Sequence, residues 1–253
     1  MTRTTASLSA LLALAPLAAA AAPIPSVPRG RVAEYEAAAR VFARAGRLEP
    51  LVELHERWQF EALRPYQSMT LGSYGRAHRN LKLGAFYRVQ KGARHDDDWT
   101  NDAAGRWDWR ATGNRPESML IVDATPRAAL GKSLVAALKV RYEHNFFNGQ
   151  RAVRLEPELA WFWLDGLTPR ATVAVRHGAY LPLNFGQTFY YERSWYLAGL
   201  WHAGSSVSVG PTVALRDAVW STSSAWRAAS AGDSYRTLRR SVVWGLHAVI
   251  RAK

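Results

Sequence analysis

From Trp58 to the end of the chain, apolar residues recur at every second position in long segments. In residues 81–91, for example, one set of alternate positions is fully apolar, and most residues between them are charged, polar or Gly. A period of two is the signature of a β-strand with two different faces. Strands of soluble proteins are mostly about 5–6 residues long, whereas membrane barrels alternate over about ten. The pattern therefore predicts an all-β chain and favours a membrane barrel.

Ten candidate strands can be delimited in this region. They are residues 57–64, 68–77, 81–91, 117–130, 133–147, 150–164, 170–182, 190–203, 206–219 and 236–250. We expect them to form a closed antiparallel transmembrane β-barrel of about ten strands over residues 57–253, with eight or twelve as alternatives.

The connections between these strands alternate in length. Short ones are residues 78–80, 131–132, 165–169 and 204–205; longer ones are 92–116, 183–189 and 220–235, with 65–67 and 148–149 as exceptions. Outer-membrane barrels have short periplasmic turns and longer external loops. An even strand count with the N-terminus on the periplasmic side would sort the connections in this way.

One hairpin has a predicted register. Asn148-Gly149 favours a two-residue type I′ turn, which needs positive φ at both positions. That turn places Glu143 opposite Arg154, Arg141 opposite Glu156, and Lys139 opposite Glu158. These opposite charges would share one face and stabilise the pair.

The polar face of the predicted strands carries both signs of charge, which suits a closed, partly wet lumen. The candidate lumenal and anion-binding residues are Arg88, Arg127, Lys139, Arg141, Arg154, Arg176, Glu143, Glu156 and Glu158. The apolar rows are interrupted mainly by His177, Arg193, Asp217 and Arg240. Trp and Tyr gather near strand ends, as in the interfacial girdles of membrane barrels. The lumen is expected to be net basic and is either a narrow anion-selective path or a space filled by ion pairs.

The N-terminal segment differs from the rest. Residues 1–22 have the features of a cleaved secretory signal: Arg3, an apolar stretch over 8–17 and a run of Ala. Residues 23–56 are expected to hold a Pro-rich linker and a short helical or disordered segment. The helix is predicted over 32–46, with Gly46 as its C-cap.

The formal net charge is +13, and the chain has no Cys. The absence of Cys excludes disulfides and thiolate chemistry. Such a charge often indicates nucleic-acid binding, but an exported chain would not meet that partner. The expected partners are the lipid bilayer, lipopolysaccharide, and anionic solutes or glycans.

The last strand resembles a known signal. Val243, Gly245, Ala248 and Ile250 have the spacing of the C-terminal assembly signal of bacterial outer-membrane proteins, in which a Gly precedes apolar residues three and five positions later. The chain departs from that family by ending in Arg251-Ala252-Lys253 rather than an aromatic residue. The resemblance implies the bacterial outer membrane as location and the barrel assembly machinery as a partner.

Few motifs indicate catalysis. Asp96, Asp97 and Asp98 are candidate oxygen ligands for a metal ion such as Ca²⁺, although their spacing does not match an EF-hand. The stretch from His144 to Gly149 distantly resembles that of outer-membrane phospholipase A, but lacks its serine, so it has no nucleophile for His144 to activate. No cofactor motif is present. A non-enzymatic channel or envelope-interaction protein is the expected function; the alternatives are a lipid-modifying enzyme with an external-loop site and a soluble periplasmic barrel.

Overall fold

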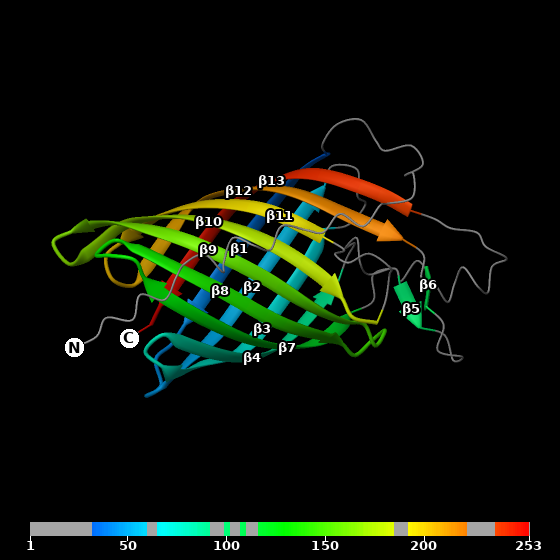
Figure 1. The fold of residues 1–253 in the computed structure, drawn as a ribbon, viewed down its shortest axis with the longest axis horizontal. Helices are drawn as coiled ribbons and strands as arrows, with labels where there is room; N and C mark the ends of the chain where they lie inside the picture. Colours follow the sequence, from blue (N-terminus) through cyan, green and yellow to red (C-terminus); the bar gives the residue numbers. More distant parts are fainter. Residues whose placement is uncertain are drawn as a thin grey trace, which may run out of the picture.

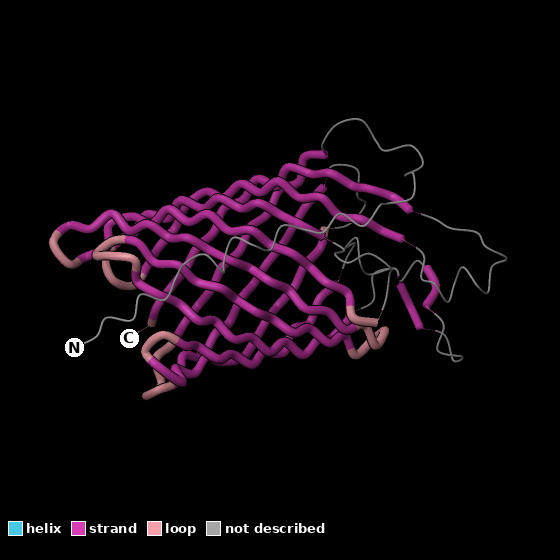
Figure 2. Tube along the Cα trace, in the orientation of Figure 1, coloured by secondary structure: helices cyan, strands magenta, loops and turns pink. Residues whose placement is uncertain are grey.

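The chain folds into a closed β-barrel, shown in Figure 1 and, by secondary structure, in Figure 2. This computed structural model describes residues 32–59, 65–91, 99–101, 107–109, 116–184, 192–221 and 236–252. The barrel strands are β1 (Val32–Phe42), β2 (Leu48–Gln59), β3 (Tyr66–His78), β4 (Leu81–Lys91), β7 (Glu117–Ala129), β8 (Leu134–Asn145), β9 (Arg151–Asp165), β10 (Thr168–Pro182), β11 (Glu192–Ala203), β12 (Val207–Ser221) and β13 (Arg236–Arg251). Strands β5 (Trp99–Asn101) and β6 (Trp107–Trp109) form a separate two-stranded sheet. The predicted all-β barrel of about ten strands is confirmed.

Eleven strands close the barrel, and this odd number determines how it closes. Each barrel strand pairs antiparallel with the next one along the chain, and β4 pairs with β7 in the same way. After ten reversals the last strand runs in the same direction as the first, so β1 and β13 pair in parallel. The expectation of an even, fully antiparallel barrel was therefore wrong at this one junction.

The connections are sorted by length between the two ends of the barrel, as predicted. One end holds the short connections 43–47, 79–80, 130–133, 166–167 and 204–206, which gather at the left of Figure 1. At the opposite end lie the strand ends that flank the connections 60–65, 92–116, 146–150, 183–191 and 222–235. We call these the short-turn end and the long-connection end. Strand β1 begins at the long-connection end, beside Ser241 of β13.

The helix predicted over residues 32–46 was wrong. Residues 32–42 form β1, and β2 begins at Leu48, so the barrel starts well before Trp58. Ala has high helix propensity, but it also fits the outer face of a strand, and tertiary pairing overrides propensity. Gly46 has a φ of +61°, as a helix C-cap would need, but here it makes the β1–β2 turn.

The β8–β9 hairpin is displaced by two residues from its predicted register, since Lys139 lies opposite Glu156 rather than Glu158. The turn is longer than predicted because the two Asn side chains order it. Asn145 Oδ1 accepts a hydrogen bond from the N–H of Phe147, and Asn148 Oδ1 accepts one from the N–H of Gln150. A shift of two residues preserves the faces, so each residue stays on the side that alternation predicted.

No helix in the described part of the chain is long and apolar enough to cross a bilayer.

Candidate functional site

The charged residues predicted for the lumen lie on the inward face of their strands. Asp123 and Glu143 are among the most buried side chains of the described residues, and Arg88 is also buried. Arg127 lies opposite Ala137, which faces the interior. Arg154 contacts the buried Glu143 at 3.6 Å. Lys139, Arg141, Arg176, Glu156 and Glu158 line an internal cavity. These side chains thus share the interior of the barrel, while their role in anion binding remains a prediction.

Cations outnumber carboxylates on the inward faces of the described strands. The inward carboxylates are Glu34, Glu36, Glu49, Glu53, Glu117, Asp123, Glu143, Glu156 and Glu158. The inward cations are Arg40, Arg57, Arg76, Lys82, Arg88, Arg127, Lys139, Arg141, Arg154, Arg176, Arg216 and Arg251. Buried charges need such partners, because an isolated one is costly to desolvate. The described inward faces therefore carry an excess of cations.

Much of that excess lies around a cavity of about 230 Å³ inside the barrel, which we call the central chamber. Its charged lining is Arg40, Lys82, Arg88, Lys139, Arg141 and Arg176 against Glu53, Glu156 and Glu158. Phe42, Tyr74 and Phe86 supply aromatic surface. Twice as many cations as carboxylates thus face one enclosed space.

Most chamber cations have a carboxylate partner. Arg176 donates two hydrogen bonds to Glu158 Oε2, at 2.9 and 2.7 Å. Arg40 donates to Glu53, which also lies 3.7 Å from Arg88. These contacts hold the guanidinium groups in place. The chamber lining as a whole still has more cations than carboxylates.

Lys139 is the exception among these cations. Its Nζ donates to the hydroxyl of Tyr74 at 3.5 Å and lies 6.0 Å from the centroid of that ring. Glu156 is directly opposite in the ladder, yet no described carboxylate oxygen lies within 4.0 Å of this Nζ. The Lys139 ammonium is therefore held by a neutral partner and remains available to an anion.

A second polar network crosses the strands where the barrel closes. Glu36 on β1 accepts from His247 Nε2 at 2.9 Å and contacts His55 Nε2 at 3.3 Å. The hydroxyl of Tyr196 lies 2.8 Å from the other ring nitrogen of His247. Sequence reasoning missed this network because it assigned residues 32–46 to a helix. The alternation of Glu34, Glu36, Ala38 and Arg40 with apolar or small residues was the signal that would have revealed it.

The other candidate motifs give no catalytic arrangement. Asp96, Asp97 and Asp98 lie outside the described residues, and the described residues contain no group of three His, Cys, Asp or Glu placed to hold a metal ion. His144 packs edge-on against Phe146, with ring centroids 4.9 Å apart, on the outward face of β8.

One histidine does lie between two hydroxyl groups inside the barrel. His202 lies 2.7 Å from the hydroxyl oxygens of both Thr172 and Ser208. Among the described residues no carboxylate is hydrogen-bonded to this ring. The arrangement lacks the acidic member that orients the base in a hydrolytic triad.

The outer face of the barrel is apolar and carries aromatic residues toward both ends. Trp161, Trp163 and Trp201 lie near the short-turn end, and the rings of Trp163 and Trp201 contact at 6.2 Å between centroids. Trp58 and Trp195 lie near the long-connection end. All five side chains are exposed, between 39% and 56%. This arrangement is typical of membrane barrels with two interfacial girdles.

Comparison with known proteins gives no match: no family model, no curated protein and no solved structure matches this chain.

Proposed function

We propose that the chain is an exported outer-membrane β-barrel that provides a narrow path selective for small anions. The proposal has two parts: a membrane-spanning wall and an anion-selective interior. Each part rests on a different set of described residues.

The membrane part rests on an arrangement opposite to that of a soluble protein. Large apolar side chains such as Leu159, Trp161 and Leu246 are exposed, while Glu34, Asp123 and Glu143 are almost completely buried. The barrel strands have 11 to 16 residues, and a tilted transmembrane strand needs about 9–11. A soluble barrel would place its apolar row inside. The apolar wall thus supports a bilayer as its surroundings.

The anion part rests on the central chamber, and its excess of cations is the observation that carries the proposal. Pores that select anions are lined by Arg and Lys, which lower the energy of an anion relative to a cation. A space of about 230 Å³ fits a small anion with part of its hydration shell, but not a glycan. The proposal therefore concerns small inorganic or carboxylate anions.

The experiment is conductance of the purified full chain in a planar lipid bilayer across a KCl gradient. We expect discrete conductance steps and a reversal potential that shows preference for chloride over potassium. In Lys139→Glu, a negative charge replaces the cation that has no carboxylate partner, so the preference should fall strongly or reverse. Arg127→Glu is the matched control, because it makes the same change of charge and Arg127 faces the lumen but does not line the chamber.

Three results would contradict the proposal. They are a cation-selective conductance, an anion preference that Lys139→Glu leaves unchanged, and insertion without conductance. The last would mean that ion pairs fill the lumen.

A further inference from the structure

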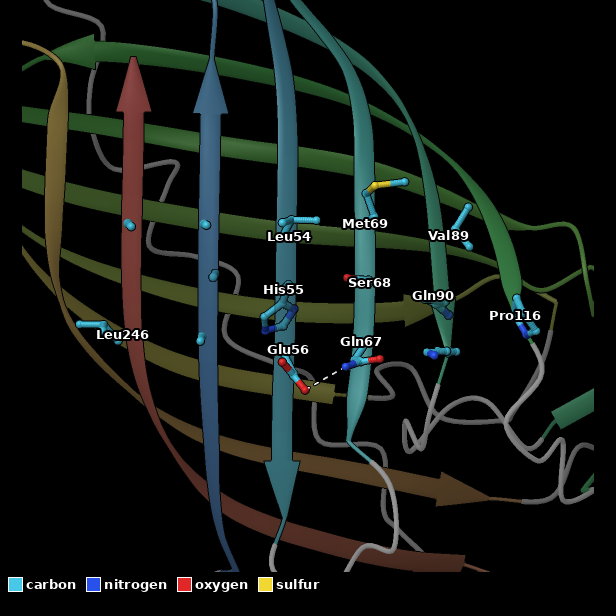
Figure 3. A pocket seen from close by; sticks show the side chains of 15 residues that line it. Leu54, His55, Glu56, Gln67, Ser68, Met69, Val89, Gln90, Pro116 and Leu246 are labelled. Carbon is cyan, nitrogen blue, oxygen red and sulfur yellow. Dashed lines mark hydrogen bonds between the residues drawn. The ribbon is translucent and has the colours of Figure 1, made fainter. Parts of the chain in front are cut away.

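The outer wall has a groove where the barrel closes, with a volume of about 650 Å³. It crosses β13, β1, β2, β3 and β4, and Figure 3 shows the labelled side chains that line it. Its floor is formed by the small residues Ala37, Ala39 and Ala248. Because Ala side chains are short, the wall is hollow here, while neighbouring strands present Leu and Met.

Two adjacent cross-strand rows make the groove amphipathic. The first is wholly apolar and runs through Ala248, Ala39, Leu54, Met69 and Val89. The second begins with Leu246 and Ala37 and continues through Glu56, Gln67 and Lys91. The apolar part would accept an acyl chain, and the polar part lies nearer the long-connection end, where a headgroup would be.

The polar residues leave specific hydrogen-bonding capacity. Gln67 Nε2 donates to Glu56 Oε1 at 3.0 Å, which Figure 3 marks with a dashed line. One amide N–H and most of the carboxylate's acceptor capacity remain unused by the described residues. Lys91 is exposed, and within the described residues no carboxylate lies within 4.0 Å of its ammonium. Lys91 is the last residue of β4, at the end of the strand where headgroups would lie.

We infer that this groove binds one phospholipid with a zwitterionic phosphoethanolamine headgroup. Lys91 and the free N–H of Gln67 would donate to the phosphate, and Glu56 would accept from the ammonium. Glu56 and Lys91 stand two strands apart, roughly 10 Å between backbones, which a long Lys side chain can bridge to a headgroup. The three residues carry no net charge, which favours a zwitterionic lipid over an anionic one. The inference rests on the proposed membrane location.

The test is native mass spectrometry of the full chain after incubation with phosphatidylethanolamine or phosphatidylglycerol at equal concentration. The wild type should retain one phosphatidylethanolamine in preference to phosphatidylglycerol. Lys91→Ala should reduce that retention about tenfold, the loss of a charge-assisted hydrogen bond. Glu56→Gln should move the preference toward phosphatidylglycerol, which a purely structural role would not do.

Filling the groove gives an independent test. Ala39→Leu should abolish retention of the lipid, while Ala136→Leu, an outward Ala on the far wall opposite Leu159, should leave it unchanged. Equal retention of both lipids in all variants would mean ordinary boundary lipid and overturn the inference. A dimer that Ala39→Leu dissociates, with no retained lipid, would assign the groove to a second copy of the chain and also overturn it.

Insertion into vesicles separates this inference from the proposed function. A chain that fails to insert contradicts both. A chain that inserts but shows no lipid preference contradicts only the lipid site.

Discussion

Two regions of the barrel present different residues to the same surroundings. The closing strands β13, β1 and β2, which we call the seam, have a patch of small residues, Ala37, Ala39 and Ala248, on an outer face that also exposes large residues such as Leu54 and Trp244. The opposite wall of β8, β9 and β10 exposes large residues such as Leu159 and Val175. Inside, the wall is held by Arg–carboxylate contacts, whereas the seam uses the His–Glu–His network around Glu36 as well.

The difference shows that closing the barrel and building the rest of its wall require different residues. The wall needs alternation of apolar and charged residues, and this pattern can be recognised directly in the sequence. The seam must join parallel strands that are far apart in the chain, and it has a patch of small residues outside and a shared carboxylate inside. The following predictions test whether the two regions differ in this way.

The largest effect is expected for a charge on the outer wall. Leu159→Arg places a cation near the middle of β9 on the outer face, which the proposed function places in lipid, and should lower the free energy of unfolding by about 2–4 kcal/mol. Leu167→Arg is the control, because Leu167 is 97% exposed in the β9–β10 turn and its replacement should cost little. Denaturant titration in lipid vesicles measures both. Equal, small effects would indicate that the wall does not face lipid.

A somewhat smaller effect is expected for overpacking the seam. At Gly245 a Cβ would lie 2.2 Å from Thr212 Oγ1 and 2.7 Å from Glu36 Cγ. Gly245→Val should therefore cost about 1–3 kcal/mol, measured by the same titration. Gly199→Ala on β11 meets nothing within 4 Å and should have a much smaller cost. A tolerated Gly245→Val would show that β13 does not approach β1 and β12 as described.

The smallest effect concerns two Arg–carboxylate contacts on neighbouring strands. Glu158→Ala removes the partner of Arg176 inside the lumen and should cost about 1 kcal/mol, the low end for a charged hydrogen bond because both side chains are a quarter exposed. Asp165→Ala removes the partner of Arg170 in a turn, where the side chains are 66% and 50% exposed. That change should stay nearer zero. The reverse order of costs would contradict the assignment of Glu158 to the lumen.

The sequence alone allowed most of the wall to be predicted. Alternation along β4 and β9 assigned the two faces correctly, and connection lengths distinguished the two ends. The seam was missed because the Ala-rich segment of β1 satisfies a helical pattern as readily as a strand pattern. The β8–β9 register was missed because Asn145 and Asn148 bond to the turn backbone, which a dipeptide rule does not consider.

The candidate site was predictable only in part. Each lumenal candidate faces inward as expected, since a period of two determines the face. The cation excess of the central chamber depends on which of these residues lie at the same depth in a tilted barrel, and on Arg40, which belongs to the strand that was missed. The pairing of strands around the closed sheet determines which residues lie at the same depth and where Arg40 is placed.

The most direct test of the whole account is a cysteine scan of β1 in this chain, which has no Cys of its own. Single cysteines at positions 34 to 41 would carry a fluorophore, and the barrel would be folded into vesicles containing brominated lipid. Strong quenching at 35, 37, 39 and 41 with weak quenching at 34, 36, 38 and 40 is the predicted result. Quenching with a helical period, in the opposite phase, or at no position would contradict a membrane-spanning barrel closed by β1.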